Sequence, residues 1–229
     1  MGEKCFVVER NKLEGTGFLA QPGECKLTRL TSKNMPALKD ILLGGMFRDR
    51  KGEHNVEEDP SYKQIIPYLY VVDSDNRFLI YQRNVDTAHY KEERLSGKVS
   101  LGIGGHMNEK DMMEGLFREF NEEAELLVNG QKIEFENGNV GLSKFNSMLN
   151  PQLMAVIDDR RDLVGEVHLG IVVAIRLRPD YLITMKNGES TRFEYVTLTD
   201  YALRKESGGV NPEGWTDIVV RKILSLSRN

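Results

Sequence analysis

Residues 102–128 read GIGGHMNEKDMMEGLFREFNEEAELLV. A glycine-rich turn precedes a segment whose apolar residues recur at helical spacing, so we expect a helix over 111–128. Asp111 stands at the expected N-cap and Glu114 follows three residues later, which is the spacing of a capping box. Gly130 lies where helices commonly end. The sequence therefore predicts one long helix with a marked start and a marked end.

Three glutamates on this predicted helix lie at positions i, i+3 and i+4, and therefore share one stripe: Glu119, Glu122 and Glu123. Like charges at this spacing destabilise a helix, and Arg118 offsets only part of the repulsion. A divalent cation would neutralise the cluster, and carboxylate oxygens favour magnesium, manganese or calcium. A solvated acidic surface is the alternative, but the preceding Gly104-Gly105 turn, which lets the backbone approach a ligand closely, favours a metal site.

The rest of the chain alternates strand-like and helix-like segments. We expect strands over 5–8, 64–72, 77–83, 99–103, 132–135, 153–157, 167–177 and 193–197, and helices over 32–46 and 212–226. The charged segment 47–60 reads as an exposed connection. Since no repeat of fixed period occurs, we expect an α/β (α+β) fold in which helices cover a central mixed sheet.

Composition excludes several classes of protein. With 229 residues and 40% hydrophobic content, the chain has enough apolar material for one well-buried core. The net charge of -4 gives no global field for nucleic acid or an anionic membrane. The two cysteines form no CxxC pair, and no apolar run is long enough for a membrane span or a secretory leader. We therefore expect a cytoplasmic protein with no membrane partner and no evident nucleic-acid surface.

The stretch around Arg118 resembles the motif of the Nudix hydrolase family, in which Arg-Glu, an aliphatic residue, any residue and Glu-Glu follow a glycine and an earlier glutamate. Arg118 to Glu123 match the later half. Lys110 stands in place of the early glutamate, a role that Asp111 or Glu109 could fill, and Glu125 stands in place of the late glycine.

The resemblance spans about residues 64–224 and implies an α/β/α sandwich. We accordingly expect a single Nudix-type domain over 1–229, with a core over 64–224 and an N-terminal extension over 1–60 packed on it.

The resemblance also implies roles for individual residues. Glu119, Glu122, Glu123 and the Gly104 carbonyl would bind Mg²⁺ or Mn²⁺, and Arg118 would orient the carboxylates. A further acid is expected from a distant loop; Glu166 is our candidate, with Asp158 and Asp159 as alternatives. The general base would then be Glu122 or Glu166. The catalytic set would thus be Arg118, Glu119, Glu122, Glu123 and Glu166. The substrate-binding set would be Gly104 and Gly105 with Arg83, which stands at the end of its strand and could contact a substrate phosphate, a surface role being the alternative.

The function implied is metal-dependent hydrolysis of a phosphoanhydride, in a nucleoside diphosphate linked to another moiety or in a related diphosphate. A non-catalytic, nucleotide-sensing module on the same fold and an isomerase are the alternatives. The expected partner is a small nucleotide or diphosphate substrate, and a homodimer stays open. His106 and His168 have no partner constellation visible in the sequence, so a structural role is the default for each.

Overall fold

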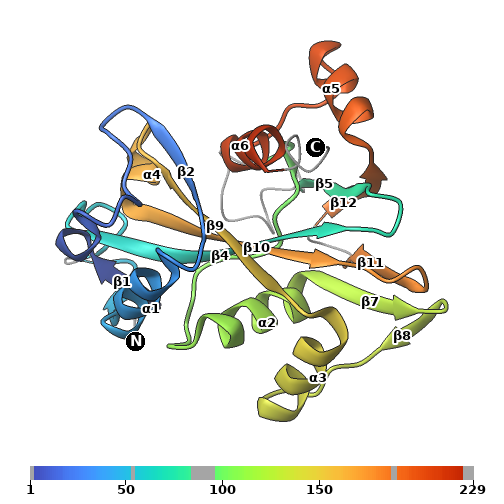
Figure 1. The fold of residues 1–229 in the computed structure, drawn as a ribbon, viewed down its shortest axis with the longest axis horizontal. Helices are drawn as coiled ribbons and strands as arrows, with labels where there is room; N and C mark the ends of the chain where they lie inside the picture. Colours follow the sequence, from blue (N-terminus) through green and yellow to red (C-terminus); the bar gives the residue numbers. More distant parts are fainter. Residues whose placement is uncertain (1–2, 53–54, 84–95, 187–189, 224–229) are drawn as a thin grey trace. The chain divides into compact units, whose positions relative to one another are not determined.

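The computed structural model describes residues 3–52, 55–83, 96–186 and 190–223 (Figure 1). The chain has the mixed α/β fold with a central mixed sheet that the sequence predicts. Contacts divide it into two compact units. Unit 1 comprises Met1–Tyr68, Gly104–Leu116 and Leu153–Val173, and unit 2 comprises Leu69–Ile103, Phe117–Gln152 and Ala174–Asn229. Strands β4 (Tyr62–Val72) and β10 (His168–Arg176) and helix α2 (Met112–Glu123) each pass from one unit into the other.

Unit 1 contains most of the N-terminal part of the chain. Its strands are hydrogen-bonded in the order β4-β10-β9-β2, and β1 pairs antiparallel with both β3 and β4. Besides the shared elements, it holds β1 (Lys4–Glu9), the 3-10 helix η1 (Arg10–Leu13), β2 (Cys25–Arg29), α1 (Met35–Leu43), β3 (Met46–Asp49), nearly all of β9 (Gln152–Asp159) and α4 (Leu163–Val167).

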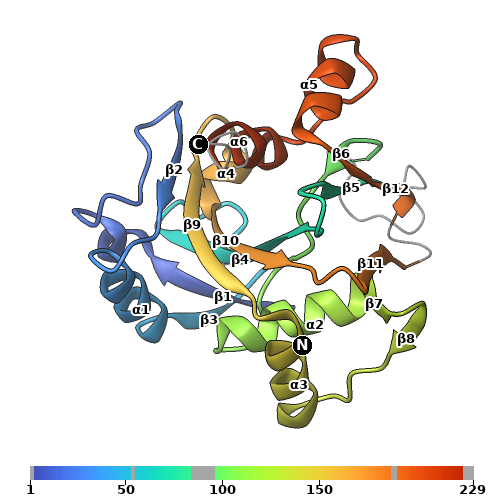
Figure 2. The same ribbon diagram turned by 45° about the vertical axis from the view of Figure 1, so that its right-hand side comes forward.

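Unit 2 contains the strand order β12-β5-β4, with β6 on β5, and a separate three-stranded sheet in the order β11-β7-β8 (Figure 2). Its own elements are β5 (Phe78–Arg83), β6 (Val99–Ser100), β7 (Ala124–Val128), β8 (Gln131–Ile133), α3 (Asn139–Leu149), β11 (Tyr181–Met185), β12 (Ser190–Val196), α5 (Leu198–Glu206) and α6 (Gly214–Lys222).

A buried ion pair lies inside unit 1. Lys63 of β4 and Asp158 of β9 both have fully buried side chains, and their Nζ and Oδ1 atoms are 2.5 Å apart. The Lys63 ammonium also donates to the carbonyls of Gly165 (2.8 Å) and His168 (3.3 Å), while Asp158 Oδ2 accepts from the Ala20 amide at 2.7 Å. Desolvation by burial lowers the pKa of Lys63, although the Asp158 carboxylate opposes that shift. Each charge is therefore compensated by several partners.

The core of unit 2 near α2 is aromatic. Phe117 and Phe120 of α2 lie in tilted or edge-on contact with Phe135 and Phe145, at ring-centroid distances between 5.1 and 6.2 Å. Such arrangements are the favourable ones for aromatic pairs. The apolar face of α2 is thereby fixed, and with it the direction of its acidic stripe.

The N-terminal third departs from the prediction in several places. The 3-10 helix η1 and strand β2 were not predicted, and α1 ends at Leu43 rather than at residue 46. Helix α1 begins at Met35 rather than at residue 32, because Asn34 Oδ1 accepts from the Thr31 amide at 2.7 Å and closes a turn before Pro36. Segment 47–60 is not simply a connection: it begins within β3, which pairs with β1 along Val7↔Met46 to Lys4↔Asp49. A strand at a sheet edge tolerates such polar residues.

The predicted C-terminal helix over 212–226 corresponds to α6, and residues 224–226 of that prediction lie outside the described residues. Within the part of the chain that is described, no helix is both long and apolar enough to cross a membrane.

Candidate active site

The acidic stripe lies at the end of α2, and the start of this helix was predicted correctly. Asp111 Oδ1 accepts from the amides of Met113 (2.7 Å) and Glu114 (3.2 Å), so Asp111 is the N-cap. The helix then carries Glu119, Glu122 and Glu123 in its last two turns. Its capped start in unit 1 therefore sets the phase of the glutamates that follow.

Arg118 joins two of the three glutamates. Its Nη2 lies 2.8 Å from Glu119 Oε1, and its Nη1 lies 3.1 Å from Glu122 Oε2. Glu119 is buried, whereas 57% of the Glu122 side chain is exposed. One guanidinium thus binds both the buried carboxylate of Glu119 and the exposed carboxylate of Glu122. Arg118 offsets only one of the three negative charges that the glutamates carry.

Helix α2 ends at Glu123, which corrects the expectation that it runs to residue 128. Strand β7 starts at the next residue and pairs with β11 from Ala124↔Met185 to Leu126↔Ile183 and beyond. Asn129 and Gly130 both have positive φ and turn the chain into β8. An Asn-Gly pair between strands is the strongest short-range hairpin signal, so the sequence held this information.

Lys186 closes the C-terminal end of α2. Its amide donates to the Glu123 carbonyl at 2.8 Å, and its ammonium donates to the carbonyl of Asn121. A cation at this end of a helix complements the helix dipole and satisfies carbonyls that have no partner within the helix. Lys186 therefore fixes the backbone that carries Glu122 and Glu123.

Arg83 belongs to a polar cluster in unit 2. Its Nε lies 3.0 Å from Glu213 Oε2, its Nη2 lies 3.4 Å from Ser100 Oγ, and its guanidinium stands 5.5 Å from the ring centre of Tyr81. Burial raises the pKa of Tyr81 well above its ordinary value; Arg83 opposes the shift and Glu123 adds to it. Glu213, Ser100 and the Tyr81 ring thus hold the Arg83 guanidinium.

Glu166, the candidate further acid, is held by two arginines in unit 1. Its Oε2 lies 2.6 Å from Arg10 Nη2, and both of its oxygens lie 3.1 Å from Arg160 Nε. Burial by itself raises the pKa of Glu166, but the hydrogen bonds from Arg160 and Arg10 outweigh it and hold the pKa below its ordinary value. A carboxylate with a lowered pKa is a weak proton acceptor.

The two alternatives to Glu166 also have cationic partners. Asp158 forms the buried pair with Lys63, and Asp159 binds both Nε (2.7 Å) and Nη2 (2.6 Å) of Arg161. The Asp159–Arg161 pair is bidentate and therefore strong, whereas Asp158 and Lys63 share one short contact. Each carboxylate thus has a cationic partner in unit 1.

Gly104 owes its identity to close packing. Its φ is +148°, and a Cβ at this position would stand 1.9 Å from the Pro67 carbonyl oxygen of β4. A side chain is therefore excluded on both conformational and steric grounds. The adjacent Gly105 lies in the same half-buried segment of unit 1.

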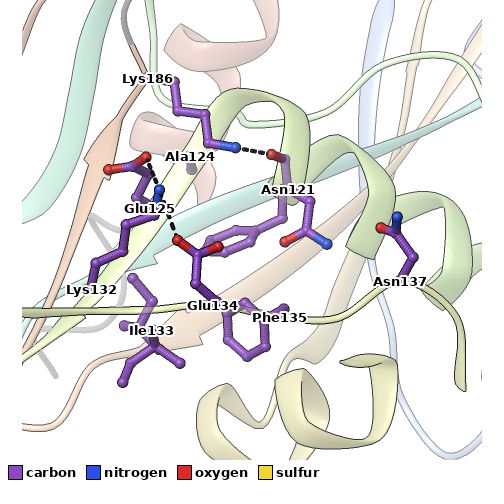
Figure 3. A pocket seen from close by; sticks show the side chains of 11 residues that line it. Asn121, Ala124, Glu125, Lys132, Ile133, Glu134, Phe135, Asn137 and Lys186 are labelled. Carbon is purple, nitrogen blue, oxygen red and sulfur yellow. Dashed lines mark hydrogen bonds and ion pairs between the residues drawn. The ribbon is translucent and has the colours of Figure 1, made fainter. Parts of the chain in front are cut away.

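A small pocket of about 200 Å³ borders α2 in unit 2 (Figure 3). It is lined by Phe120, Asn121, Phe135 and Lys186, among others, and by the ion pairs of Lys132 with Glu125 (2.8 Å) and Glu134 (3.1 Å). Ligand pockets for nucleotide-sized molecules usually exceed about 300 Å³. None of the predicted metal ligands lines it, so we do not assign the substrate to this pocket.

A further cluster was not predicted from the sequence. Glu57, His106 and His168 bring their ligand atoms within 4.8 Å of one another in unit 1, a group that could hold a metal ion. The two histidines are 62 positions apart, and neither is part of a short motif, so no local pattern signalled their contact.

Comparisons with known proteins agree with this fold. No protein-family model matches the chain. Protein YmaB of Bacillus subtilis (strain 168) is 32% identical over 173 residues, which cover 75% of each protein. The crystal structure of Tm1382, assigned to the Nudix hydrolases, superposes with a TM-score of 0.64 at 25% identity over 98% of this chain and 99% of that one. The chain belongs to the Nudix family.

As a Nudix protein, the chain is a hydrolase. DR0079 of Deinococcus radiodurans, at 14% identity and a TM-score of 0.51 over 86% of this chain and 98% of that one, shares the fold. The Tm1382 match covers nearly all of both chains, so the N-terminal residues that the motif left unexplained have counterparts in that Nudix structure.

Proposed function

We propose that this Nudix protein hydrolyses a phosphoanhydride in a nucleoside diphosphate linked to another moiety, or in a related diphosphate, with Mg²⁺ or Mn²⁺ bound by Glu119, Glu122 and Glu123. The observation that supports it best is the arrangement at the end of α2, where Arg118 binds Glu119 at 2.8 Å and Glu122 at 3.1 Å. The Arg118 guanidinium orients the carboxylates of Glu119 and Glu122, which lie about one helical turn apart.

The donor set fits the proposed ions. Three carboxylates on adjacent positions of one helical stripe supply hard oxygen ligands, and a single arginine leaves a net negative charge to be balanced. A bound Mg²⁺ or Mn²⁺ would supply charge neutralisation on the diphosphate and a water of lowered pKa. The Gly104 carbonyl stays in the proposed ligand set on the sequence resemblance alone, because Gly104 belongs to unit 1 and the three glutamates belong to unit 2.

We assign the general base to Glu122. Its side chain is 57% exposed, so it can reach a water, and it makes a single ion pair with Arg118 at 3.1 Å. Glu166, the other candidate from sequence, is bound by two guanidiniums and is less basic. In this proposal Glu166 orders unit 1 through Arg10 and Arg160 instead of accepting the proton.

Arg83 is proposed to position the substrate phosphate. Gly104 and Gly105 stay in the proposed substrate-binding set on the sequence resemblance alone. A guanidinium binds phosphate in a planar, directional way, and Glu213 and Ser100 hold that of Arg83 in a defined orientation. Replacement by alanine should therefore raise KM more than it lowers kcat.

The test is phosphate or nucleotide release from a panel of nucleoside diphosphate derivatives with Mg²⁺, Mn²⁺ or a chelator. We expect Glu122→Gln and Glu123→Gln to lower kcat by at least about 100-fold, the usual scale of a lost acid–base group. Glu125→Gln is the matched control, since Glu125 lies on the adjacent strand and pairs with Lys132. If Glu122→Gln and Glu123→Gln were as active as the Glu125→Gln control, or if the unmodified protein were fully active in the chelator, the assignment of the metal site to α2 would be refuted.

A further inference from the structure

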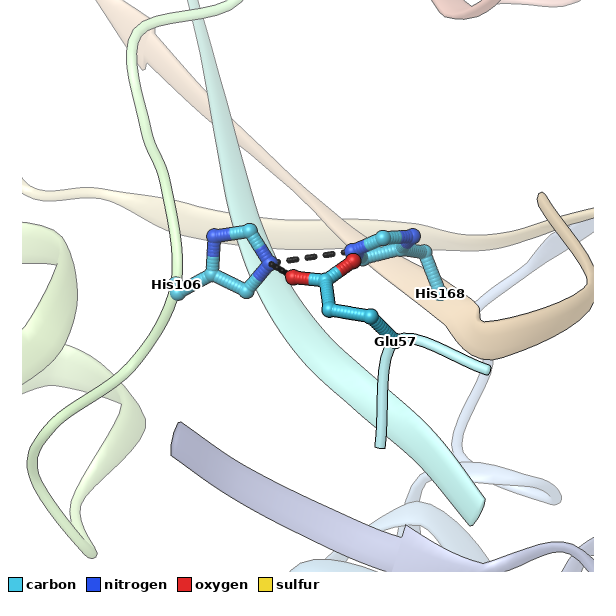
Figure 4. Close-up of side chains that lie close together, drawn as sticks. All are labelled: Glu57, His106 and His168. Carbon is cyan, nitrogen blue, oxygen red and sulfur yellow. Dashed lines mark hydrogen bonds and ion pairs between the residues drawn. The ribbon is translucent and has the colours of Figure 1, made fainter. Parts of the chain in front are cut away.

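Three segments of unit 1 bring metal-ligating side chains together. Glu57 lies between β3 and β4, His106 lies two residues after Gly104, and His168 is the first residue of β10 (Figure 4). The Nε2 atoms of the two histidines are 2.9 Å apart, and Glu57 Oε1 is 4.0 Å from His106 Nε2. Figure 4 shows the Glu57 carboxylate facing both imidazoles. The side chains therefore converge on one point.

The hydrogen bond behind His168 prepares it as a ligand. His168 Nδ1 lies 2.7 Å from the Val164 carbonyl oxygen, so Nδ1 carries the proton and donates it. In the neutral ring, Nε2 then presents its lone pair toward His106 and Glu57. Metal-binding histidines almost always donate their other ring N–H to a carbonyl or carboxylate in this way.

We propose that Glu57, His106 and His168 form a second metal site, for Zn²⁺ or a closely similar transition-metal ion. Two imidazoles and one carboxylate are a known three-ligand zinc set, which leaves a further position for water. With metal–nitrogen bonds of about 2.0–2.1 Å, two nitrogens in neighbouring tetrahedral positions stand roughly 3.3–3.4 Å apart. The Nε2 atoms are 2.9 Å apart, so a small separation of the two rings would admit the ion.

Both histidines are largely shielded from solvent. His168 is 6% exposed, and the His106 side chain is 15% exposed. Without a metal, the His106 Nε2 hydrogen is donated to Nε2 of His168. Glu57 Oε1 must move closer to the histidines to ligate, since it lies 4.0 Å from His106 Nε2 and is held at 2.5 Å from Arg50 Nε. Arg50 keeps a second carboxylate partner in Glu3 at 3.1 Å, so the shift does not strand its charge.

The ligand types separate this site from the one proposed on α2. Imidazole nitrogen selects zinc and its transition-metal neighbours, whereas an all-carboxylate set selects Mg²⁺ or Mn²⁺. Cys5 does not join the set, because burial raises the pKa of its thiol to about 12 and its Sγ donates to Gln64 Oε1 at 3.3 Å. A bound zinc would cross-link the β3–β4 connection, the segment that leads to the Asp111 cap, and the start of β10.

The test is titration of chelator-treated full-length protein with Zn²⁺, by calorimetry and by competition with a chromogenic chelator, in excess Mg²⁺ to occupy carboxylate sites. We expect one equivalent to bind, and Co²⁺ to give the visible d–d absorption of a site with nitrogen ligands. His168→Ala and His106→Ala should weaken binding by at least about 100-fold, since even changes behind a ligand cost roughly 10–100-fold.

Glu57→Gln is included because Glu57 is half-exposed, so this substitution should leave the fold intact while removing a ligand. Glu58→Gln is the matched control, since Glu58 is an exposed neighbour outside the proposed ligand set. Far-UV circular dichroism before titration establishes that each variant is folded. If folded Glu57→Gln and His106→Ala bind Zn²⁺ as tightly as the unmodified protein, or if the unmodified protein binds none, the site is a histidine–histidine hydrogen bond and the proposal fails. The Mg²⁺-dependent assay of Glu122→Gln is independent of this outcome.

Discussion

At the scale of single residues, the surroundings of each carboxylate decide what it can do. Glu122 is mostly exposed and touches one arginine, Glu119 is buried against the same arginine, and Glu166 is bound by two. The sequence offered them as nearly equivalent acids. Only the structure separates them. Arg10 lies 156 positions from Glu166 in the chain and Arg160 lies 6 positions before it, and the fold brings both guanidiniums onto one carboxylate.

The clamp on Glu166 predicts how stability depends on pH. Its pKa in the folded protein lies below the ordinary value of 4.5, so its contribution is fully present above about pH 4.5 and is lost as pH falls through the folded pKa. We expect Glu166→Gln to lower the free energy of unfolding by about 1.5–3 kcal/mol at pH 7, the usual value of hydrogen bonds to a charged group.

Urea denaturation of both proteins between pH 3 and pH 7 checks this. The difference between Glu166→Gln and the unmodified protein should shrink toward the acid end. A difference that stays constant, or one that grows as pH falls, would show that the carboxylate charge is not the source of the stabilisation.

At the scale of elements, the sequence predicted strongly patterned segments and missed those defined by long-range pairing. The capped start of α2, the β4–β5 hairpin and α6 follow from local signals, and all three are present. The end of α2 was placed too late because helix propensity and apolar spacing continue through Ala124 to Val128. Pairing with β11 overrides that local preference, which is common for strand positions.

The same reasoning explains which contacts and elements the sequence did not predict. The acidic stripe is a local pattern and could be read from the sequence, whereas the contact of His106 with His168 depends on where β10 starts relative to the segment after Gly104. Strand β11 and helix α3 were likewise not predicted, although α3 ends at Asn150 with φ +44°, a common helix terminator.

The N-cap of α2 gives a prediction at this scale. Asp111→Ala removes the acceptor for the Met113 and Glu114 amides, and we expect a loss of about 1 kcal/mol in the free energy of unfolding. Asp111→Asn keeps a side-chain oxygen and should retain most of the stability. Thermal denaturation of the three proteins in one buffer makes the comparison. Equal destabilisation by Ala and Asn would mean that charge, rather than capping, carries the effect.

At the scale of the whole chain, each unit contains its own charged interior feature. Unit 1 encloses Lys63 with Asp158, and unit 2 encloses Arg83 with Glu213. Buried pairs of this kind often add little net stability compared with apolar residues of the same size, but breaking one is costly because it leaves a buried charge.

The Lys63–Asp158 pair therefore predicts strong non-additivity. Lys63→Met alone and Asp158→Leu alone should each destabilise the protein by about 3–5 kcal/mol, because either leaves an uncompensated charge. The double variant should be more stable than the sum of the two losses implies. A double-mutant cycle of unfolding free energies measures this coupling, and strictly additive losses would contradict the pairing.

The direct passage from α2 into β7 limits where residues can be inserted into or deleted from this chain. Glu123 ends the helix, and its carbonyl already accepts from Lys186, so no loop separates the acidic stripe from a paired strand. Adding one residue after Glu123 would exchange the two faces of β7 and turn Leu126 outward, since side chains alternate along a strand. Insertions and deletions should therefore be tolerated at the Asn129-Gly130 turn and selected against at the Glu123–Ala124 junction.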